Sequence, residues 1–278
     1  MRMQYIDTGG TATRCVLAGA AEAPALVLLH GLALTADVWL RNVAALARSH
    51  RVIAPDMLGH GFTRPADGTI VDVPAKLRHL AQLLDALDLK RVSLCGSSYG
   101  ALMAALLFFD RPDRVDRLVI NGSGSCFNTE DQLAAQMGRM RLLYAPDRVA
   151  DSSLQDWRER IGNNFFDTGK LPAELPPIAQ LCYAQHWAPQ RLAESMALMQ
   201  DSARFRPFRI LERLEALTCP TLVVWGRNDR GGAPESAAAA VERIPDGRLV
   251  MFDDCGHYPM IEHPDRYNAE IAAFLAAA

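Results

Sequence analysis

Residues 91–110 read RVSLCGSSYGALMAALLFFD, and this stretch decides the fold. A short β-branched run, RVSL, leads into the turn sequence GSSYG at 96–100, and a segment that is apolar on nearly all sides follows. This order predicts a buried strand, a tight turn and a buried helix in direct succession. The turn matches the pattern G-x-S-x-G, in which a serine sits on a strained strand-to-helix turn. Ser98 is therefore our candidate nucleophile.

The residues around Ser98 suit a nucleophile, although a simpler interpretation is open. Gly96 and Gly100 leave room where the turn presses on neighbouring backbone. The N-terminus of the following helix favours negative charge beside Ser98. The same residues also fit an ordinary helix start, with Ser97 or Ser98 capping the first turn. Because a serine hydroxyl needs a base before it can attack, the rest of the chain must decide between the two.

Several other apolar runs resemble the strand before Ser98. They are uniformly apolar and not alternating, which indicates a sheet covered on both faces. Helical patterns fill the gaps, so the sequence predicts an α/β fold with a mostly parallel sheet. The expected strands are 25–29, 51–54, 91–94, 117–121, 221–225 and 248–252. The expected helices are 74–87, 99–109 and 265–277.

The alternation of strands and helices breaks between about residues 123 and 214. This segment offers no convincing strand, shows several amphipathic helical patterns and carries many of the large aromatic side chains. A helical insertion between two strands of the core sheet explains this pattern. We therefore expect a core of residues 1–122 and 215–278, with a helical unit at 123–214.

Two polar residues follow the last two predicted strands and complete a catalytic set with Ser98. Asp229 comes after the strand at 221–225, and His257 comes after the strand at 248–252. The carboxyl ends of parallel strands meet at one edge of the sheet, where open α/β folds build their sites. There His257 would take the proton of Ser98, and Asp229 would orient the imidazole. Asp253 and Asp254 are alternative acids because they lie near His257 in the sequence.

The composition argues against several classes of partner. Half of the residues are hydrophobic, 22% are charged, and the formal net charge is -3. With no basic surplus and no polybasic run, neither nucleic acid nor a membrane surface is an expected partner. The N-terminus lacks the apolar core of a signal peptide, which predicts a cytoplasmic protein. The six cysteines lack metal-site spacing, so we expect free thiols, no metal and no cofactor. Oligomeric state is left open.

Together these motifs resemble the α/β-hydrolase superfamily. The resemblance is carried by His30-Gly31 with Trp39 downstream, DMLGHG at 56–61, GSSYG at 96–100, WGRND at 225–229 and Gly256-His257. It runs in order across nearly the whole chain. It implies an eight-stranded core with a helical cap inserted after the sixth strand, and a pocket between cap and core. It also implies that the DMLGHG stretch is a structural turn.

The resemblance also implies where the oxyanion of an acyl intermediate is bound. One donor is the backbone N–H of the residue after the nucleophile, which is Tyr99 here. The second comes from the loop after an early strand, and we assign it to the backbone N–H of Leu32. His30, Trp187 and Tyr258 are expected to contribute to a pocket for a small apolar acyl substrate, with His30 chiefly bonding loop backbone.

The main expectation for activity is hydrolysis of a small carboxylic ester, thioester or lactone through an acyl-Ser98 intermediate. An alternative is suggested by the stretch FDDCGHYPMIEHPDRYNAEIAAFL at 252–275, which resembles carbon–carbon hydrolases of meta-cleavage products. A third possibility is a ligand-binding receptor that retains an inactive triad.

The chain departs from the carbon–carbon hydrolases at two places. Those enzymes usually have a glycine-rich loop after His-Gly, where this chain has LALTAD at 32–37. They also carry an arginine in a cap helix that polarises the keto acid, and a rough alignment places Cys182 at that position. The arginines nearest in sequence that could substitute are Arg191, Arg204, Arg206 and Arg209.

Overall fold

A computed structural model describes residues 1–277 of the chain. Its centre is one eight-stranded sheet with the strand order β1-β2-β4-β3-β5-β6-β7-β8. Strands β3 to β8 run parallel to one another, while β1 and β2 are antiparallel to their neighbours. The strands are β1 (Arg2–Thr8), β2 (Thr11–Ala18), β3 (Ala25–Leu29), β4 (Arg51–Pro55), β5 (Val92–Ser97), β6 (Val115–Asn121), β7 (Thr221–Gly226) and β8 (Gly247–Phe252).

The six apolar runs predicted from the sequence form β3 to β8, and the predicted α/β fold is confirmed. Strands β3, β5 and β7 are buried along their whole length, as their uniformly apolar sequences indicate. Strand β8 lies at the edge of the sheet and is only partly buried.

The sequence analysis missed β1 and β2, which form a hairpin at the other edge of the sheet. Strand β1 is exposed along most of its length, so its sequence has no apolar run to reveal it. The two strands pair through a two-residue turn at Gly9 and Gly10, both of which have positive φ angles. A Gly-Gly pair between two short strands is a hairpin signal that could have predicted this element.

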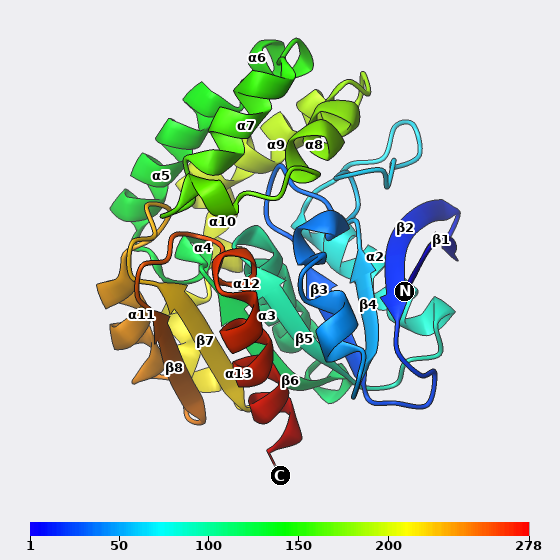
Figure 1. Cartoon of the computed structure of the whole chain (residues 1–278), viewed down its shortest axis with the longest axis vertical. Helices are drawn as coiled ribbons and strands as arrows, with labels where there is room; N and C mark the ends of the chain where they lie inside the picture. Colours follow the sequence, from blue (N-terminus) through cyan, green and yellow to red (C-terminus); the bar gives the residue numbers. More distant parts are fainter. Residues whose placement is uncertain (278) are drawn as a thin grey trace.

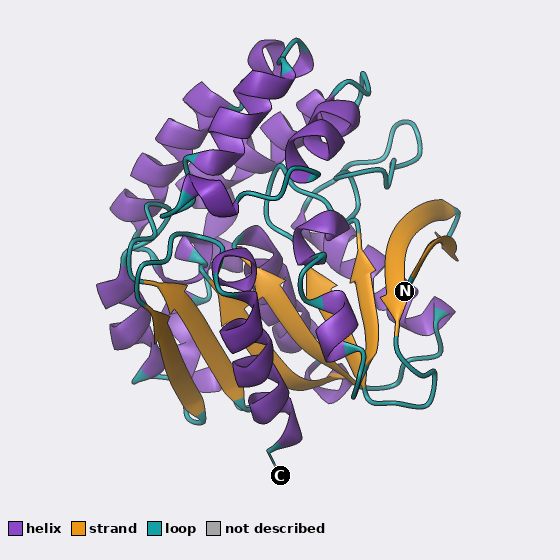
Figure 2. Cartoon of the chain, viewed as in Figure 1, coloured by secondary structure: helices purple, strands orange, loops and turns teal. Residues whose placement is uncertain are grey.

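Helices cover both faces of the sheet (Figure 2). The three helices predicted from spacing appear as α2, α3 and α13, each within two residues of its expected ends. In Figure 1, α13 crosses in front of the sheet, and α2 and α3 lie behind it. The core helices are η1 (Ala36–Trp39), α1 (Val43–Leu46), α2 (Val73–Ala86), α3 (Tyr99–Asp110), η2 (Pro112–Arg114), α11 (Pro234–Val241), α12 (Pro259–Glu262) and α13 (Pro264–Ala276).

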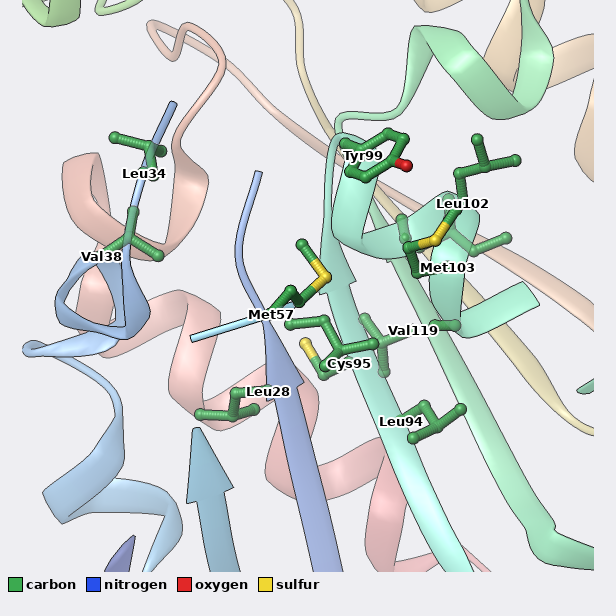
Figure 3. Packing of buried hydrophobic residues seen from close by; sticks show 14 of the residues in the cluster. Leu28, Leu34, Val38, Met57, Leu94, Cys95, Tyr99, Leu102, Met103 and Val119 are labelled. Carbon is green, nitrogen blue, oxygen red and sulfur yellow. The ribbon is translucent and has the colours of Figure 1, made fainter. Parts of the chain in front are cut away.

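The hydrophobic core joins α3 to the middle of the sheet. Leu94 on β5 and Val119 on β6 are fully buried, as are Leu102 and Met103 on α3 (Figure 3). Burying one such side chain contributes about 1.5–3 kcal/mol relative to leaving it in water. This packing fixes the start of α3 relative to the end of β5, which is where Ser98 lies.

Every regular element between β6 and β7 is a helix. Helices α5 to α10 lie together beyond the carboxyl ends of the parallel strands (Figure 1). The elements between β6 and β7 are α4 (Gly124–Phe127), α5 (Glu130–Leu143), α6 (Pro146–Ala150), α7 (Leu154–Gly162), η3 (Thr168–Lys170), α8 (Leu175–Tyr183), α9 (Ala188–Gln200), α10 (Ser202–Phe205), η4 (Arg206–Phe208) and η5 (Leu211–Ala216). We call residues 123–214 the cap; its treatment as a separate unit stays a prediction. Within residues 1–277, no helix is both long enough and apolar enough to cross a membrane.

A buried lysine connects the cap to the core. Lys76 lies on α2, and its Nζ donates to Ser195 Oγ on cap helix α9 at 2.8 Å and to Tyr99 Oη at 3.2 Å. Burial lowers the pKa of Lys76 to about 7, although the carboxylates of Asp72 and Glu194 act in the opposite direction. An ammonium group without a carboxylate in direct contact is costly to bury, so the folded chain favours the neutral amine.

We therefore expect Lys76 to make stability depend on pH. Its pKa is about 7 in the folded protein and about 10.4 in an unfolded chain. Between these values the unfolded chain binds a proton that the folded chain does not, so stability rises with pH. Urea unfolding from pH 7 to 10 should show the wild type gaining stability relative to Lys76→Met. A constant difference across that range would mean that Lys76 stays charged when buried.

Candidate active site

Ser98 occupies the turn between β5 and α3 in a strained backbone conformation. Its φ is 54° and its ψ is -117°, a region that residues other than glycine rarely adopt. Such a conformation costs about 1–3 kcal/mol and persists only where the surroundings enforce it. Here the Ser98 N–H donates to Asn121 O at 2.8 Å, and its carbonyl accepts from Ser123 Oγ at 2.7 Å. Asn121 is the last residue of β6 and Ser123 follows it in the next loop, so the end of the neighbouring strand and the loop after it hold the turn.

The two glycines of the turn are required by space. A Cβ on Gly96 would lie 2.4 Å from the backbone of Ala101, and one on Gly100 would lie 2.3 Å from Leu29 O. Real Cβ atoms do not approach backbone atoms this closely. The start of α3 can therefore press against β3 and its own strand only because both positions lack a side chain.

His257 and Asp229 are brought together from the loops after β8 and β7. The imidazole Nδ1 lies 2.8 Å from Asp229 Oδ2, and the other carboxylate oxygen, Oδ1, accepts from the Gly231 N–H at 2.7 Å. The Asp229 side chain has no exposed surface. With Asp229 accepting at Nδ1, the other ring nitrogen of His257 is left as the base.

The two alternative acids are placed differently. Asp253 forms an ion pair with Arg227 at 2.6 Å, and 73% of its side chain is exposed. Asp254 takes the left-handed conformation at the turn after β8, with a φ of 49°. The structure therefore pairs Asp229, and neither of these two residues, with His257.

The electrostatics of His257 suit a general base. Burial alone would lower its pKa, but the Asp229 carboxylate outweighs that effect and the pKa of His257 is raised from its usual value. The raised pKa means that imidazolium formation is stabilised when the ring accepts a proton. Neutral imidazole, the form that can act as a base, then predominates only at a pH above that raised value.

Ser98 and His257 line one cavity between the cap and the core, with a volume of about 220 Å³. Leu32 and Tyr258 line it too, as expected from the sequence. The full lining is Gly31, Leu32, Leu34, Ser98, Gln136, Arg139, Met140, Leu143, Tyr144, Asn163, Asn164, Arg230, Gly231, His257 and Tyr258.

The two proposed oxyanion donors lie beside Ser98. Tyr99 follows it directly, and a Cβ on Gly31, the residue before Leu32, would lie 3.3 Å from Ser98 Cβ. In the part of the chain that the structure describes, neither the Leu32 N–H nor the Tyr99 N–H has a hydrogen-bond acceptor. Two free N–H groups beside a nucleophile can donate hydrogen bonds to an oxygen on which negative charge develops.

Two of the expected pocket residues are absent from this lining. His30 is fully buried below the site, where Nε2 accepts from the Met57 N–H at 3.0 Å and Nδ1 lies 2.7 Å from Gly31 O. Burial lowers the pKa of His30, so the ring is neutral and ties two loops together. Trp187 packs against the core at the start of α9. The expectation that these two residues contribute to this cavity is corrected accordingly.

The sequence analysis missed the contribution of cap helix α5. Gln136, Arg139, Met140 and Leu143 all line the cavity. Their spacing of three and four residues places them on one face of the helix, and this pattern could have been found in the sequence. Nothing in the sequence alone indicates that this face turns toward Ser98.

Glu262 is a further residue that the sequence analysis missed. It is buried, and its carboxylate accepts from the N–H groups of Gly256 at 2.8 Å, Phe166 at 2.9 Å and Asp167 at 3.2 Å. Phe166 and Asp167 belong to the cap, whereas Gly256 precedes His257. This carboxylate therefore joins the cap to the loop that carries the candidate base.

Comparisons with known proteins agree with this architecture. A family model described as alpha/beta hydrolase fold matches residues 24–264. A 2-hydroxymuconate semialdehyde hydrolase of Pseudomonas sp. strain CF600 is 33% identical, over 91% of this chain and 87% of its own. A 2-hydroxy-6-oxo-2,4-heptadienoate hydrolase of Pseudomonas putida is 32% identical, over 99% and 96%. A solved meta-cleavage product hydrolase from Pseudomonas fluorescens has a TM-score of 0.77 and 27% identity, covering 98% of this chain and 97% of its own.

These comparisons overturn the main expectation for activity. Relatives that match nearly the whole chain are named for 2-hydroxy-6-oxodienoate compounds, not for esters, thioesters or lactones. The expectation of an esterase-type hydrolase is therefore wrong, and its alternative is better supported. The sequence motifs around Ser98 could not have decided this, because the same turn serves several acyl-transfer reactions.

Two glycine-to-alanine substitutions should show whether a glycine is required by space at the turn, in contrast to a glycine on an exposed helix face. Gly100→Ala should destabilise the protein by more than about 2 kcal/mol, because the new methyl group meets strand backbone. Gly138→Ala on α5 is the matched control, because nothing lies within 4 Å of the new methyl group. It should stabilise the helix by up to about 1 kcal/mol. Urea unfolding measures both, and equal effects would refute the steric account of the turn.

Substitution of the candidate acids should show which carboxylate supports the base. We expect Asp229→Asn to slow the labelling of Ser98 by a fluorophosphonate roughly 10³-fold or more, as loss of the acid does in such triads. Asp253→Asn should label at the wild-type rate. The wild-type rate should rise with pH around a midpoint above the usual histidine pKa of about 6.5. A slow Asp253→Asn beside a fast Asp229→Asn would reverse the assignment.

Proposed function

The chain belongs to the α/β-hydrolase fold family, and we propose that it hydrolyses a carbon–carbon bond in a 2-hydroxy-6-oxodienoate. The observation that carries the proposal is that Ser98 and His257 line one cavity, with Asp229 bonded to His257, in a chain whose full-length relatives are named for such compounds. The cap at 123–214 would close the substrate away from water.

The names of the relatives' substrates identify the bond that a hydrolase would break. A 2-hydroxy-6-oxo-2,4-dienoate contains no ester or amide bond. Addition of water at its C6 carbonyl releases a carboxylic acid when a carbon–carbon bond at C6 breaks, and only on the C5 side can the departing electron pair be delocalised. We therefore assign C6 as the carbon that Ser98 attacks in this chain.

The carbon fragment must leave in a stabilised form. Transfer of the 2-hydroxyl proton to C5 gives the 2,6-diketone, with a double bond between C3 and C4. When C5 then leaves from C6, its electron pair is delocalised through that double bond onto the C2 oxygen. The first product is a dienolate, which takes up a proton to become 2-hydroxypenta-2,4-dienoate.

Ser98, His257 and Asp229 would act on C6 as an acyl-transfer triad. His257 takes the proton of Ser98 as the Ser98 oxygen bonds to C6, and Asp229 stabilises the imidazolium. The N–H groups of Leu32 and Tyr99 would donate hydrogen bonds to the C6 oxygen and stabilise the negative charge that develops on it. His257 returns the proton to the leaving dienolate, and water, activated by the same base, then hydrolyses the acyl-Ser98 ester.

A spectroscopic assay tests the proposal. Wild-type protein should remove the dienolate absorbance of 2-hydroxy-6-oxo-2,4-heptadienoate over many turnovers. Ser98→Ala should be slower by a factor of about 10³ or more, because it lacks the nucleophile.

The proposal fails if Ser98 is labelled by a fluorophosphonate, which shows a working nucleophile, while no dienoate is consumed. Dienoates with hydrogen, methyl and phenyl on C6 should all be tried, because the cavity volume restricts this group. Steady turnover of any of them would also exclude a receptor with an inactive triad.

A further inference from the structure

Two exposed arginines contribute to the lining of the cavity at Ser98, and no acidic residue does. Arg139 and Arg230 belong to its lining, which includes neither aspartate nor glutamate. Two arginines in neighbouring segments are neutralised: Arg209 pairs with Glu130, and Arg227 pairs with Asp253. Within residues 1–277, no carboxylate pairs with Arg139 or Arg230 in this way. A cavity with unpaired cationic groups attracts an anionic ligand.

The segments that carry the two arginines come from different parts of the chain and meet at one side of the cavity. Arg139 lies on cap helix α5, one turn after Gln136, and Arg230 lies beside Gly231 in the loop after β7. Gln136 Oε1 and Gly231 O would lie 2.9 Å and 2.7 Å from a Cβ placed on Gly124. Helix α5 and the acid-bearing loop therefore meet at this point, which brings the two arginine-bearing segments together.

This side of the cavity adjoins the candidate base. A Cβ on Gly231 would lie 3.2 Å from His257 Nδ1 and 3.1 Å from Asp229 Oδ1. Because the base returns a proton to the leaving group, the leaving dienolate fragment lies on the His257 side of C6. The carboxylate of that fragment is four bonds beyond C5, roughly 5 Å when extended. An arginine side chain on this side of the cavity is long enough to bind that carboxylate.

The other arginines considered from the sequence are placed elsewhere. Arg191 pairs with Glu194 at 2.8 Å, and with Arg204 it lines a different cleft. Cys182, at the aligned position of the family's cap arginine, is buried and donates its thiol to Gly61 O at 3.1 Å. Neither this cysteine nor those arginines line the cavity of Ser98.

We infer that Arg139 and Arg230 together form the carboxylate-binding subsite of this cavity. The ligand class is a carboxylic acid with a short unsaturated chain, bound by charge-assisted hydrogen bonds from one or both guanidinium groups. The claim that this subsite binds the carboxylate of the substrate rests on the proposed function. The claim that these two residues form a subsite for an anion does not rest on it.

A pair of ligands that differ only in charge tests the subsite without requiring turnover. Sorbate, the anion of 2,4-hexadienoic acid, has a carboxylate on a conjugated chain, and sorbamide replaces it with a neutral amide. Titration calorimetry on the wild-type protein should give a dissociation constant for sorbate about tenfold lower than that for sorbamide, since a charge-assisted hydrogen bond contributes about 1.5–3 kcal/mol. This preference should weaken as salt is added.

Substitutions then show which residues cause the preference for sorbate over sorbamide. The double variant Arg139→Gln/Arg230→Gln should bind sorbate and sorbamide about equally. Arg141→Gln is the matched control, because Arg141 lies on the same helix, bonds Gln200 and is not part of the lining. It should keep the wild-type preference for sorbate.

The inference is overturned if wild-type protein binds both ligands alike, or if the double variant keeps the preference. Its outcome is separable from that of the proposed function. If sorbate binding depends on the two arginines but the protein consumes no dienoate, the subsite is supported and carbon–carbon hydrolysis is rejected. Dienoate turnover that is unchanged in the double variant would retain the reaction and show that the two arginines do not bind the carboxylate of the substrate.

Discussion

The positive φ angle of Ser98 is the constraint on which the site depends. It turns the chain from the end of β5 straight into α3, so that the serine lies at the carboxyl edge of the sheet with a helix N-terminus behind it. Gly96 and Gly100 make the turn sterically possible, and hydrogen bonds with the end of β6 and the loop after it hold it. The loops after β7 and β8 end at the same edge. Because the sheet is parallel there, Asp229 and His257 lie at the same end of it as Ser98, and His257 lines the same cavity.

The cap completes the site through a few buried polar contacts. Glu262 binds backbone N–H groups of the cap and of the loop before His257, so the position of the base depends on cap packing. Lys76 bonds both Ser195 on α9 and the hydroxyl of Tyr99, whose N–H is a proposed oxyanion donor. Buried polar groups with specific partners fix one arrangement of two units more strictly than apolar packing does. Both contacts connect residues of the cap to groups beside Ser98.

The sequence predicts the parts of this protein that local patterns determine. Six apolar runs identify β3 to β8, and the GSSYG turn identifies Ser98 because a strand and a buried helix flank it. The hairpin of β1 and β2 is not predicted, because exposed edge strands need not be apolar. Helix α5 shows its lining face by spacing, but the direction of that face depends on long-range packing. For the same reason Trp187 is placed wrongly in the pocket, and Arg139 and Arg230 could not be distinguished from the other arginines. The triad does not encode which bond is broken, so the proposal of carbon–carbon cleavage rests on the relatives.

The most direct test of the account is product analysis in ¹⁸O-labelled water. If Ser98 attacks the C6 ketone and water hydrolyses the acyl intermediate, 2-hydroxy-6-oxo-2,4-heptadienoate should yield acetate that carries one oxygen from the solvent. Mass spectrometry of the acetate, with Ser98→Ala as the blank, measures this label. Enrichment that depends on Ser98 is the predicted result. Disappearance of the dienoate without labelled acetate would contradict hydrolysis of the carbon–carbon bond by this triad.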